Sequence, residues 1–201
     1  MRGYTIHNIA VSWATHLNRY AQKEGIALQK MTLGIEIFLH NIPKLVLIAA
    51  VAALLGILPW VAVTWASFAC VRRYASGLHA GNSITCTIVS LLMFVGIPYV
   101  MQDMRLDAHV FCLWLAVIAI ALYRYAPADT AACPIVGKKK RARLKKRAVI
   151  SCAVVMALAL LLFNDAYYGL IALGTSYALI LVLPITYKIL KRSMNNYEKY
   201  E

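Results

Sequence analysis

Long runs without a charged residue dominate the chain and predict membrane-spanning helices. They cover residues 45–71, 83–102, 108–123, 148–164 and 166–187. About 20 apolar residues cross a hydrocarbon core of about 30 Å, so several of these runs are long enough to span a bilayer. The composition agrees, since 62% of the residues are hydrophobic and 14% are charged. We therefore predict one all-α, polytopic integral membrane helical bundle that forms a single domain over residues 1–201.

The first apolar run is too long for one untilted helix and carries Gly56 and Pro59 near its middle. Each half is about 20 Å long, which is too short to cross alone. Two arrangements fit residues 31–71. One is a re-entrant pair of half-helices, and the other is a broken crossing made of 31–42 and 45–58, followed by a second helix. We predict about four full spans plus this broken or re-entrant pair.

The segment before the first apolar run mixes polar and apolar residues at helical spacing. Its apolar positions are Ile6, Ile9, Ala10, Trp13, Leu17 and Tyr20. Polar residues fall between them, which predicts an amphipathic helix lying in the membrane interface over residues 1–30. Farther on, Glu36 and Lys44 lie eight residues apart, about two helical turns. We expect these two side chains to form an ion pair; the alternative is that Lys44 extends to the lipid headgroups.

The most basic stretch of the chain sets the predicted topology. Residues 138–147 hold eight Lys and Arg residues in ten, within a net charge of +13. Such a run can bind nucleic acid, but between apolar spans it is typical of a cytoplasmic loop and also attracts anionic lipid headgroups. We therefore predict no nucleic-acid partner, a basic cytoplasmic loop over 127–147 and a cytoplasmic tail over 188–201. Counting spans back from the loop places residues 72–86 on the cytoplasmic side.

Reactive side chains gather between two apolar runs, where polar groups are costly unless they are used or paired. His79 and Cys86 are the residue types of a general base and the nucleophile that it activates. On one ideal helix they would lie about 10 Å apart along the axis, whereas proton transfer needs about 3 Å. His79 must therefore lie in a loop that folds back, and Gly77 and Gly81 are suited to such a loop.

The residues that follow predict the start of a helix. Asn82 or Ser83 is a good N-cap, which places Cys86 in the first turn, where the helix dipole favours a thiolate. The free N–H groups of that turn, or the side chains of Asn82, Ser83 and Thr85, are placed to hold an oxyanion. No third and fourth ligand lie near His79 and Cys86, so we expect neither a metal nor a cofactor.

This stretch resembles the signature of the accessory gene regulator B (AgrB) family of membrane peptidases. Its core reads R-x-x-x-G-x-H-A-x-x-x-x-x-C, within residues 72–86. Two more blocks agree with the family: Gly34-Ile-Glu36 followed by Asn41 and Lys44, and Tyr125-Ala-Pro-Ala-Asp-Thr130 followed by Pro134-Ile135. The similarity covers most of residues 30–150. Ser76 departs from the pattern, because the family often has a second glycine there, and this bears on the tightness of the loop.

The resemblance implies a multi-pass protein of the bacterial cell membrane, with Cys86 as nucleophile and His79 as general base on the cytoplasmic side. The implied substrate is an AgrD-like precursor peptide with an amphipathic leader, a small core and an acidic tail. Cys86 would attack the carbonyl at the core–tail junction, release the tail and form a thioester. A core cysteine or serine would then close a thiolactone or lactone ring. The family also implies a homodimer.

The nearby charges suit an acidic substrate tail. Arg72 and Arg73 are candidates to bind its carboxylates, because guanidinium groups bind carboxylates in bidentate fashion. Three lysines are expected to attract the tail over a longer range: Lys138, Lys139 and Lys140. Asp129 is the nearest candidate in the chain to orient His79.

Two other functions are compatible with these residues. The first is a non-enzymatic transporter or exporter whose polar cytoplasmic mouth binds an anion or a peptide, in which Cys86→Ser would be tolerated. The second is a membrane enzyme that uses His79 with Arg72 and Arg73 on phospholipid headgroups, in which Cys86 would be dispensable.

Overall fold

The computed structural model describes residues 2–78, 83–101, 105–131, 134–163 and 165–199. These residues form helices joined by short connections, with one isolated β-bridge among them, so the predicted all-α class is confirmed. The chain divides into two compact units, Met1–Val51 and Ala52–Glu201, which are described separately below.

The first unit contains α1 (Arg2–Ala21) and most of α2 (Gly25–Leu54). The prediction of one interfacial helix over residues 1–30 is wrong in its extent, because the chain turns at residues 22–24. Asn18 fixes this turn: its side chain accepts a hydrogen bond from the Lys23 N–H (2.7 Å) and donates one to the Lys23 carbonyl (2.9 Å). Such a side chain supplies partners that the backbone lacks at a helix end.

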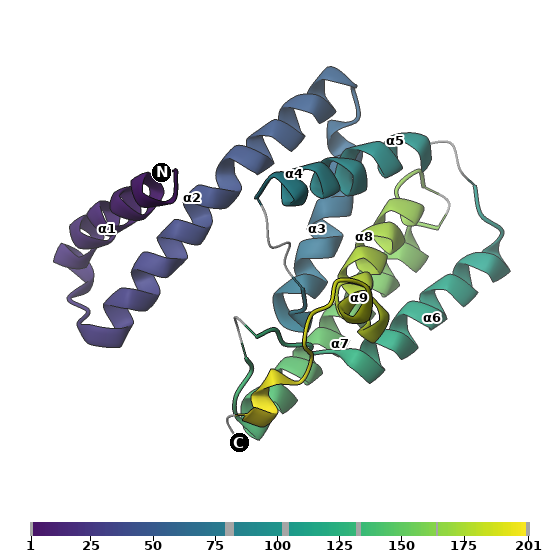
Figure 1. Ribbon diagram of the computed structural model, residues 1–201. Coiled ribbons are helices and arrows are strands. Elements are labelled where there is room, and N and C mark those ends of the chain that lie inside the picture. Colours follow the sequence, from purple (N-terminus) through teal and green to yellow (C-terminus); the bar gives the residue numbers. More distant parts are fainter. Residues whose placement is uncertain (1, 79–82, 102–104, 132–133, 164, 200–201) are drawn as a thin grey trace. The chain divides into compact units, whose positions relative to one another are not determined.

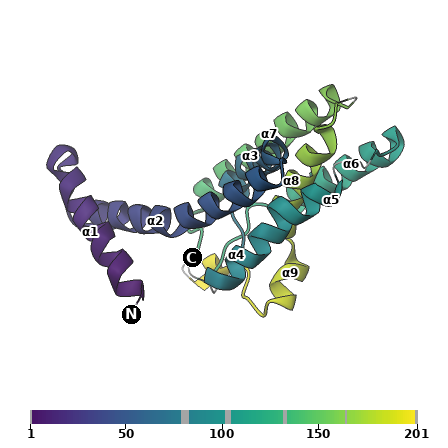
Figure 2. The same cartoon turned by 90° about the horizontal axis from the view of Figure 1, so that it is seen from above.

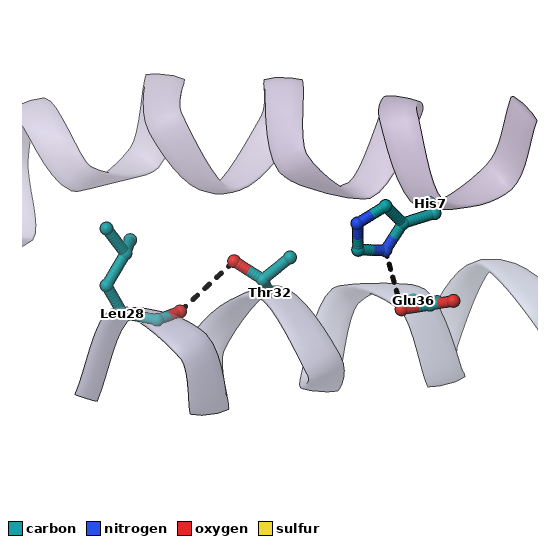
Figure 3. A network of polar contacts seen from close by, with 4 residues as sticks. All are labelled: His7, Leu28, Thr32 and Glu36. Atoms are coloured by element: carbon teal, nitrogen blue, oxygen red, sulfur yellow. Dashed lines mark hydrogen bonds and ion pairs between the residues drawn. The ribbon is translucent and has the colours of Figure 1, made fainter. Parts of the chain in front are cut away.

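A polar contact joins α1 to α2 within this unit. The Nδ1 atom of His7 lies 3.3 Å from a carboxylate oxygen of Glu36, and Thr32 bonds the Leu28 carbonyl on the neighbouring turn of α2 (Figure 3). The predicted ion pair between Glu36 and Lys44 is not among the ion pairs of the described residues. The prediction considered only neighbours along α2, whereas the partner of Glu36 comes from α1.

The break in the first apolar run falls where Gly56 and Pro59 predicted it. α2 ends at Leu54, Gly56 has φ +70°, and α3 (Leu58–Ala75) begins with Pro59 in its first turn. A proline is well tolerated there because the first helical N–H groups have no intrahelical acceptor. Since α2 is continuous from Gly25 to Leu54, the first helix is not a short half-helix of a re-entrant pair. The alternative is correct in placing a second helix after it, but wrong in its break between residues 42 and 45 and in its bounds.

The second unit is a bundle in which α3 packs against α7 and α8, and α6 packs against the same two helices (Figures 1 and 2). Its elements after α3 are α4 (Ser83–Leu91), the π-helical turn η1 (Leu92–Gly96), α5 (Ile97–Met101), α6 (Ala108–Tyr125), α7 (Lys138–Leu161), α8 (Tyr168–Ile180), α9 (Pro184–Ile189) and the 3-10 helix η2 (Asn196–Lys199). Its core includes buried side chains from α3, α6, α7 and α8.

The backbones of α3 and α8 approach each other closely at Gly174. A Cβ atom there would collide with the carbonyl oxygen of Thr64 and lie 2.9 Å from the Cβ of Ser67. Small residues at helix contacts allow this approach, as is common between membrane helices. The contact holds α3, which carries Arg72 at its end, firmly against α8.

Three of the described helical segments are long and apolar enough to cross a membrane: α2, Ser83–Met101 and α6. α6 has the expected two faces, with Phe111, Leu115, Ile118 and Leu122 buried, whereas Leu113, Val117 and Ile120 are exposed. Exposed leucine and isoleucine of this kind suit a lipid surface. The protein is therefore a multi-pass membrane protein.

The sequence predicts four full spans, whereas three helical segments of the described residues are long and apolar enough to cross a membrane. The predicted span 166–187 is interrupted, since α8 ends at Ile180 and α9 is a separate short helix. The predicted basic loop over 127–147 is also corrected, because the basic residues form the first turns of α7, which continues through the apolar run to Leu161. Lysine and arginine are good helix formers, so the run extends the helix that follows it.

Candidate active site

Cys86 lies in the first turn of α4, which starts at Ser83. This confirms the helix start that the sequence predicts. The thiol is half-exposed, and the side chains of Ser83 and Thr85 are exposed beside it. His79 and Asn82, the other two predicted residues of this segment, lie outside the described residues. The nucleophile candidate is thus at a helix N-terminus, beside backbone N–H groups that have no acceptor within the helix.

The chain leaves α3 abruptly before His79. Ser76 has φ +57° and Gly77 has φ +105°, both in the left-handed region. The Leu78 N–H then donates to the Leu181 carbonyl (3.0 Å), which ties this segment to the end of α8. The prediction of a non-helical approach to His79 is confirmed for residues 76–78. Steric crowding also requires glycine at position 77, because a Cβ there would collide with the carbonyl oxygen of Leu181.

The two arginines of the site occupy different positions. The Nη2 atom of Arg72 donates to the carbonyls of Gly77 (3.0 Å) and Leu78 (2.6 Å), the two residues before His79. Its Nη1 atom is buried and has no hydrogen-bond partner among the described residues. Arg73 is exposed and lies against the ring of Tyr74, with 5.9 Å between guanidinium carbon and ring centre. Arg72 therefore holds the approach to His79, whereas Arg73 faces outward.

A second segment runs beside this approach. Ser76 and Ala128 form a parallel β-bridge, in which the Ala128 N–H donates to the Ala75 carbonyl (3.1 Å). The residues after α6 are thereby fixed beside the residues that lead to His79. The sequence blocks 72–86 and 125–135 are thus brought together by the pairing of Ser76 with Ala128.

Asp129, the residue after Ala128, is almost completely buried, with 4% of its surface exposed. Its two carboxylate oxygens accept the N–H groups of Asn196 (3.0 Å) and Tyr197 (2.9 Å). Its backbone carbonyl accepts the hydroxyl of Tyr187 (2.8 Å). A role for Asp129 in orienting His79 stays a prediction, but the described contacts of its carboxylate are to the C-terminal segment.

Tyr187 lies between the two segments of the site. Burial raises the pKa of its phenol to about 12; the guanidinium of Arg72 opposes this rise and the carboxylate of Asp129 adds to it. Tyr187 and Asn196 were missed by the sequence reasoning, because no spacing connects either residue with residue 129: Tyr187 ends the last apolar run and Asn196 lies beyond it. The one signal for such partners in the sequence was Asp129 itself, because a carboxylate that becomes buried requires hydrogen-bond donors.

The basic residues of α7 are placed at its N-terminus. Lys138, Lys139 and Lys140 are exposed there. Positive charge at a helix N-terminus is unfavourable because it meets the positive end of the helix dipole, so this surface favours an anionic partner. Arg141 differs from the lysines: its guanidinium carbon lies 3.8 Å from the ring centre of Tyr197, and Nη1 donates to the Ile135 carbonyl (3.3 Å).

Within the described part of the chain, no three His, Cys, Asp or Glu side chains are grouped so that they could hold a metal ion.

Comparison with known proteins gives consistent results. The family model of accessory gene regulator B matches residues 8–183. An AgrB-like protein of Clostridium acetobutylicum is 39% identical over 185 residues, which cover 92% of this chain and 88% of that protein. An AgrB-like protein of Listeria monocytogenes is 37% identical over 86% of this chain and 84% of its own length. Accessory gene regulator protein B of Staphylococcus aureus is 29% identical over 87% of this chain and 92% of its own length. No solved structure matches the chain.

Proposed function

The chain belongs to the accessory gene regulator B family, and we propose that it is a membrane-embedded cysteine endopeptidase that cleaves and cyclises an AgrD-like precursor peptide. The observation that carries this proposal is the position of Cys86 in the first turn of α4, after a non-helical segment that Arg72 fixes. A thiol activated by a nearby base is the requirement for this chemistry, and His79 is the base that the family signature supplies.

The first step is attack on the precursor. His79 takes the proton of Cys86, and Sγ adds to the carbonyl carbon at the core–tail junction. The negative charge on the carbonyl oxygen is stabilised by the free N–H groups at the start of α4, together with Asn82, Ser83 or Thr85. The C–N bond then breaks, the leaving amine takes the proton from His79, and the acidic tail departs. The core remains on Cys86 as a thioester.

The second step closes the ring. A thiol or hydroxyl within the core gives its proton to His79, attacks the thioester carbonyl and displaces the thiolate of Cys86, which then takes the proton back. A thiolactone forms by exchange of one thioester for another, so no ATP is required. Water would compete by hydrolysing the thioester, and a site at the mouth of a membrane helix limits its access.

The arginines and lysines have separate roles in this proposal. Arg72 positions the residues before His79 through its Nη2 atom. Arg73 and the lysines at the start of α7 are exposed, and they attract the acidic tail by charge. The same surface also suits anionic lipid headgroups. The positive charge of α7 supports a cytoplasmic site, and family membership supports a homodimer.

The test is incubation of the purified protein in nanodiscs with the AgrD-like precursor of the same cell, followed by intact-protein mass spectrometry. The proposal predicts a species heavier by the leader and core, with the tail released, and a cyclic product later. Cys86→Ala abolishes both, and His79→Ala slows tail release at least about 10²-fold. Tail release that persists in Cys86→Ala would refute the peptidase and favour a transporter or another enzyme.

A further inference from the structure

The C-terminal segment 193–199 is fastened to the loop that lies beside the approach to His79. We propose that this segment is part of the active-site scaffold, and that Asp129 is a positioning residue that acts through it. The inference goes beyond cleavage and cyclisation, and it rests on the proposed function only for the identity of the site. It assigns a role to a segment that lies beyond the family match, which ends at residue 183.

The contacts of the segment converge on the residues that follow α6. Both carboxylate oxygens of Asp129 are taken up by consecutive backbone N–H groups, those of Asn196 and Tyr197. The ring of Tyr197 lies over the guanidinium of Arg141 in the first turn of α7. The segment is therefore attached at both ends of the loop 126–137, to Asp129 near its start and to Arg141 just after it.

The segment is itself rigid where it meets Asp129. The Ser193 hydroxyl donates to Oδ1 of Asn196 (2.6 Å), and Nδ2 of Asn196 donates to the Ser193 carbonyl (2.9 Å). Asn196 is 3% exposed, so its side chain is satisfied within the protein. A turn closed by its own side chains presents its N–H groups in fixed positions, and a carboxylate that accepts them makes strong, charge-assisted bonds.

The loop that carries Asp129 also contacts the residues that lead to His79. Ala128, the residue before Asp129, is hydrogen-bonded to Ala75 and pairs with Ser76. The carbonyls of the next two residues, Gly77 and Leu78, are held by Arg72. The hydroxyl of Tyr187 bonds the carbonyl of Asp129 from α9. The approach to His79 is thus held by Arg72 on one side and by the fastened loop on the other.

This role differs from direct action of Asp129 on His79. If Asp129 oriented the imidazole through its carboxylate, removal of the C-terminal segment would leave the site intact. If Asp129 acts through the segment, removing either partner has the same effect, and removing both adds nothing further. A double-mutant cycle separates the two possibilities.

The experiment compares five full-length or truncated proteins in nanodiscs: wild type, Asp129→Ala, a chain ending at Arg192, the combination of these two changes, and the control Asp165→Ala. Asp165 is an exposed acid in the turn between α7 and α8. Hydrogen exchange with mass spectrometry reports the amides of Leu78 and Ala128, and the pH profile of Cys86 alkylation reports the thiol. Exchange in α6 reports whether each protein is folded.

The proposal predicts at least tenfold faster exchange at Leu78 and Ala128 in each single variant, and no further increase in the combination. It also predicts that Cys86 loses the same share of its low-pH reactivity in both single variants, whereas Asp165→Ala matches wild type. Wild-type exchange in the truncated chain would overturn the proposal. So would a change in Cys86 reactivity that Asp129→Ala causes and truncation does not. If Asp129→Ala does not fold, the truncated chain alone decides.

Failure of the proposed function would be distinguishable. A wild-type Cys86 with ordinary reactivity at every pH would count against the peptidase dyad. The exchange comparison at Leu78 and Ala128 needs neither substrate nor catalysis, so it would still support or overturn the scaffold role of residues 193–199.

Discussion

Gly77 is the residue that limits how the chain can approach the candidate site. Its φ of +105° and the collision of an added Cβ with the Leu181 carbonyl both require glycine. We predict that Gly77→Ala lowers the rate of tail release at least about 10²-fold, because a displacement of about 1 Å near reacting groups has that effect. Precursor cleavage followed by mass spectrometry measures the rate. Gly169→Ala, where a Cβ meets nothing within 4 Å, is the control, and equal rates in both variants would contradict the prediction.

The two arginines give a matched pair at the same scale. Arg72→Lys keeps the charge but cannot reach both carbonyls as a planar guanidinium does. We predict that it lowers the maximal cleavage rate about tenfold or more, whereas Arg73→Lys changes mainly the apparent affinity for the precursor and makes it more sensitive to salt. Steady-state cleavage at two salt concentrations separates these effects. A larger loss of maximal rate in Arg73→Lys would refute the assignment.

Ser76 is a serine in a conformation that suits glycine, with φ +57° and ψ −142°. Such a backbone costs about 1–3 kcal/mol in other residues, whereas glycine adds about 0.5–1 kcal/mol of chain entropy to the unfolded state. We predict that Ser76→Gly raises the free energy of unfolding by about 1 kcal/mol. Thermal unfolding in one detergent, with Ser76→Ala as control, measures this. A lower melting temperature for Ser76→Gly than for wild type would contradict it.

At the scale of elements, the pairing of α3 with α8 depends on Gly174. A Cβ there meets a backbone carbonyl of α3, which cannot rotate away as a side chain could. We predict that Gly174→Ala destabilises the protein by about 1–3 kcal/mol, the usual cost of overpacking. Gly169→Ala on the same helix should be nearly neutral. Thermal unfolding of both variants provides the measurement, and the reverse order of stability would disprove this view of the contact.

The elements show where sequence reasoning succeeds. Charge-free runs predicted the candidate spans Ser83–Met101 and α6 almost to the residue, because a continuous apolar pattern has clear ends. The N-cap chemistry around Ser83 likewise predicted the start of α4. The basic residues before Ala148 are predicted to form a loop, yet they belong to α7. Charge fixed their environment but not their conformation, since lysine and arginine favour helices.

At the scale of the whole molecule, the remaining contacts could not be predicted because they join distant parts of the chain. Glu36 bonds His7 across a turn, and Asp129 bonds residues 196 and 197, 67 and 68 positions away. No local periodicity encodes such pairs. The candidate nucleophile could be found from a short motif, whereas the residues that support its surroundings became visible only in the folded chain.

The central claim is that Cys86 reacts as a thiolate that His79 maintains. The most direct test is the pH dependence of Cys86 alkylation by a soluble reagent in membranes, in a protein whose other four cysteines have been replaced, with and without His79→Ala. We predict that the alkylation rate of Cys86 reaches half its maximum at a pH well below the ordinary thiol pKa of about 8.5. We also predict that this midpoint rises when His79 is replaced. An ordinary midpoint that does not respond to His79→Ala would contradict it.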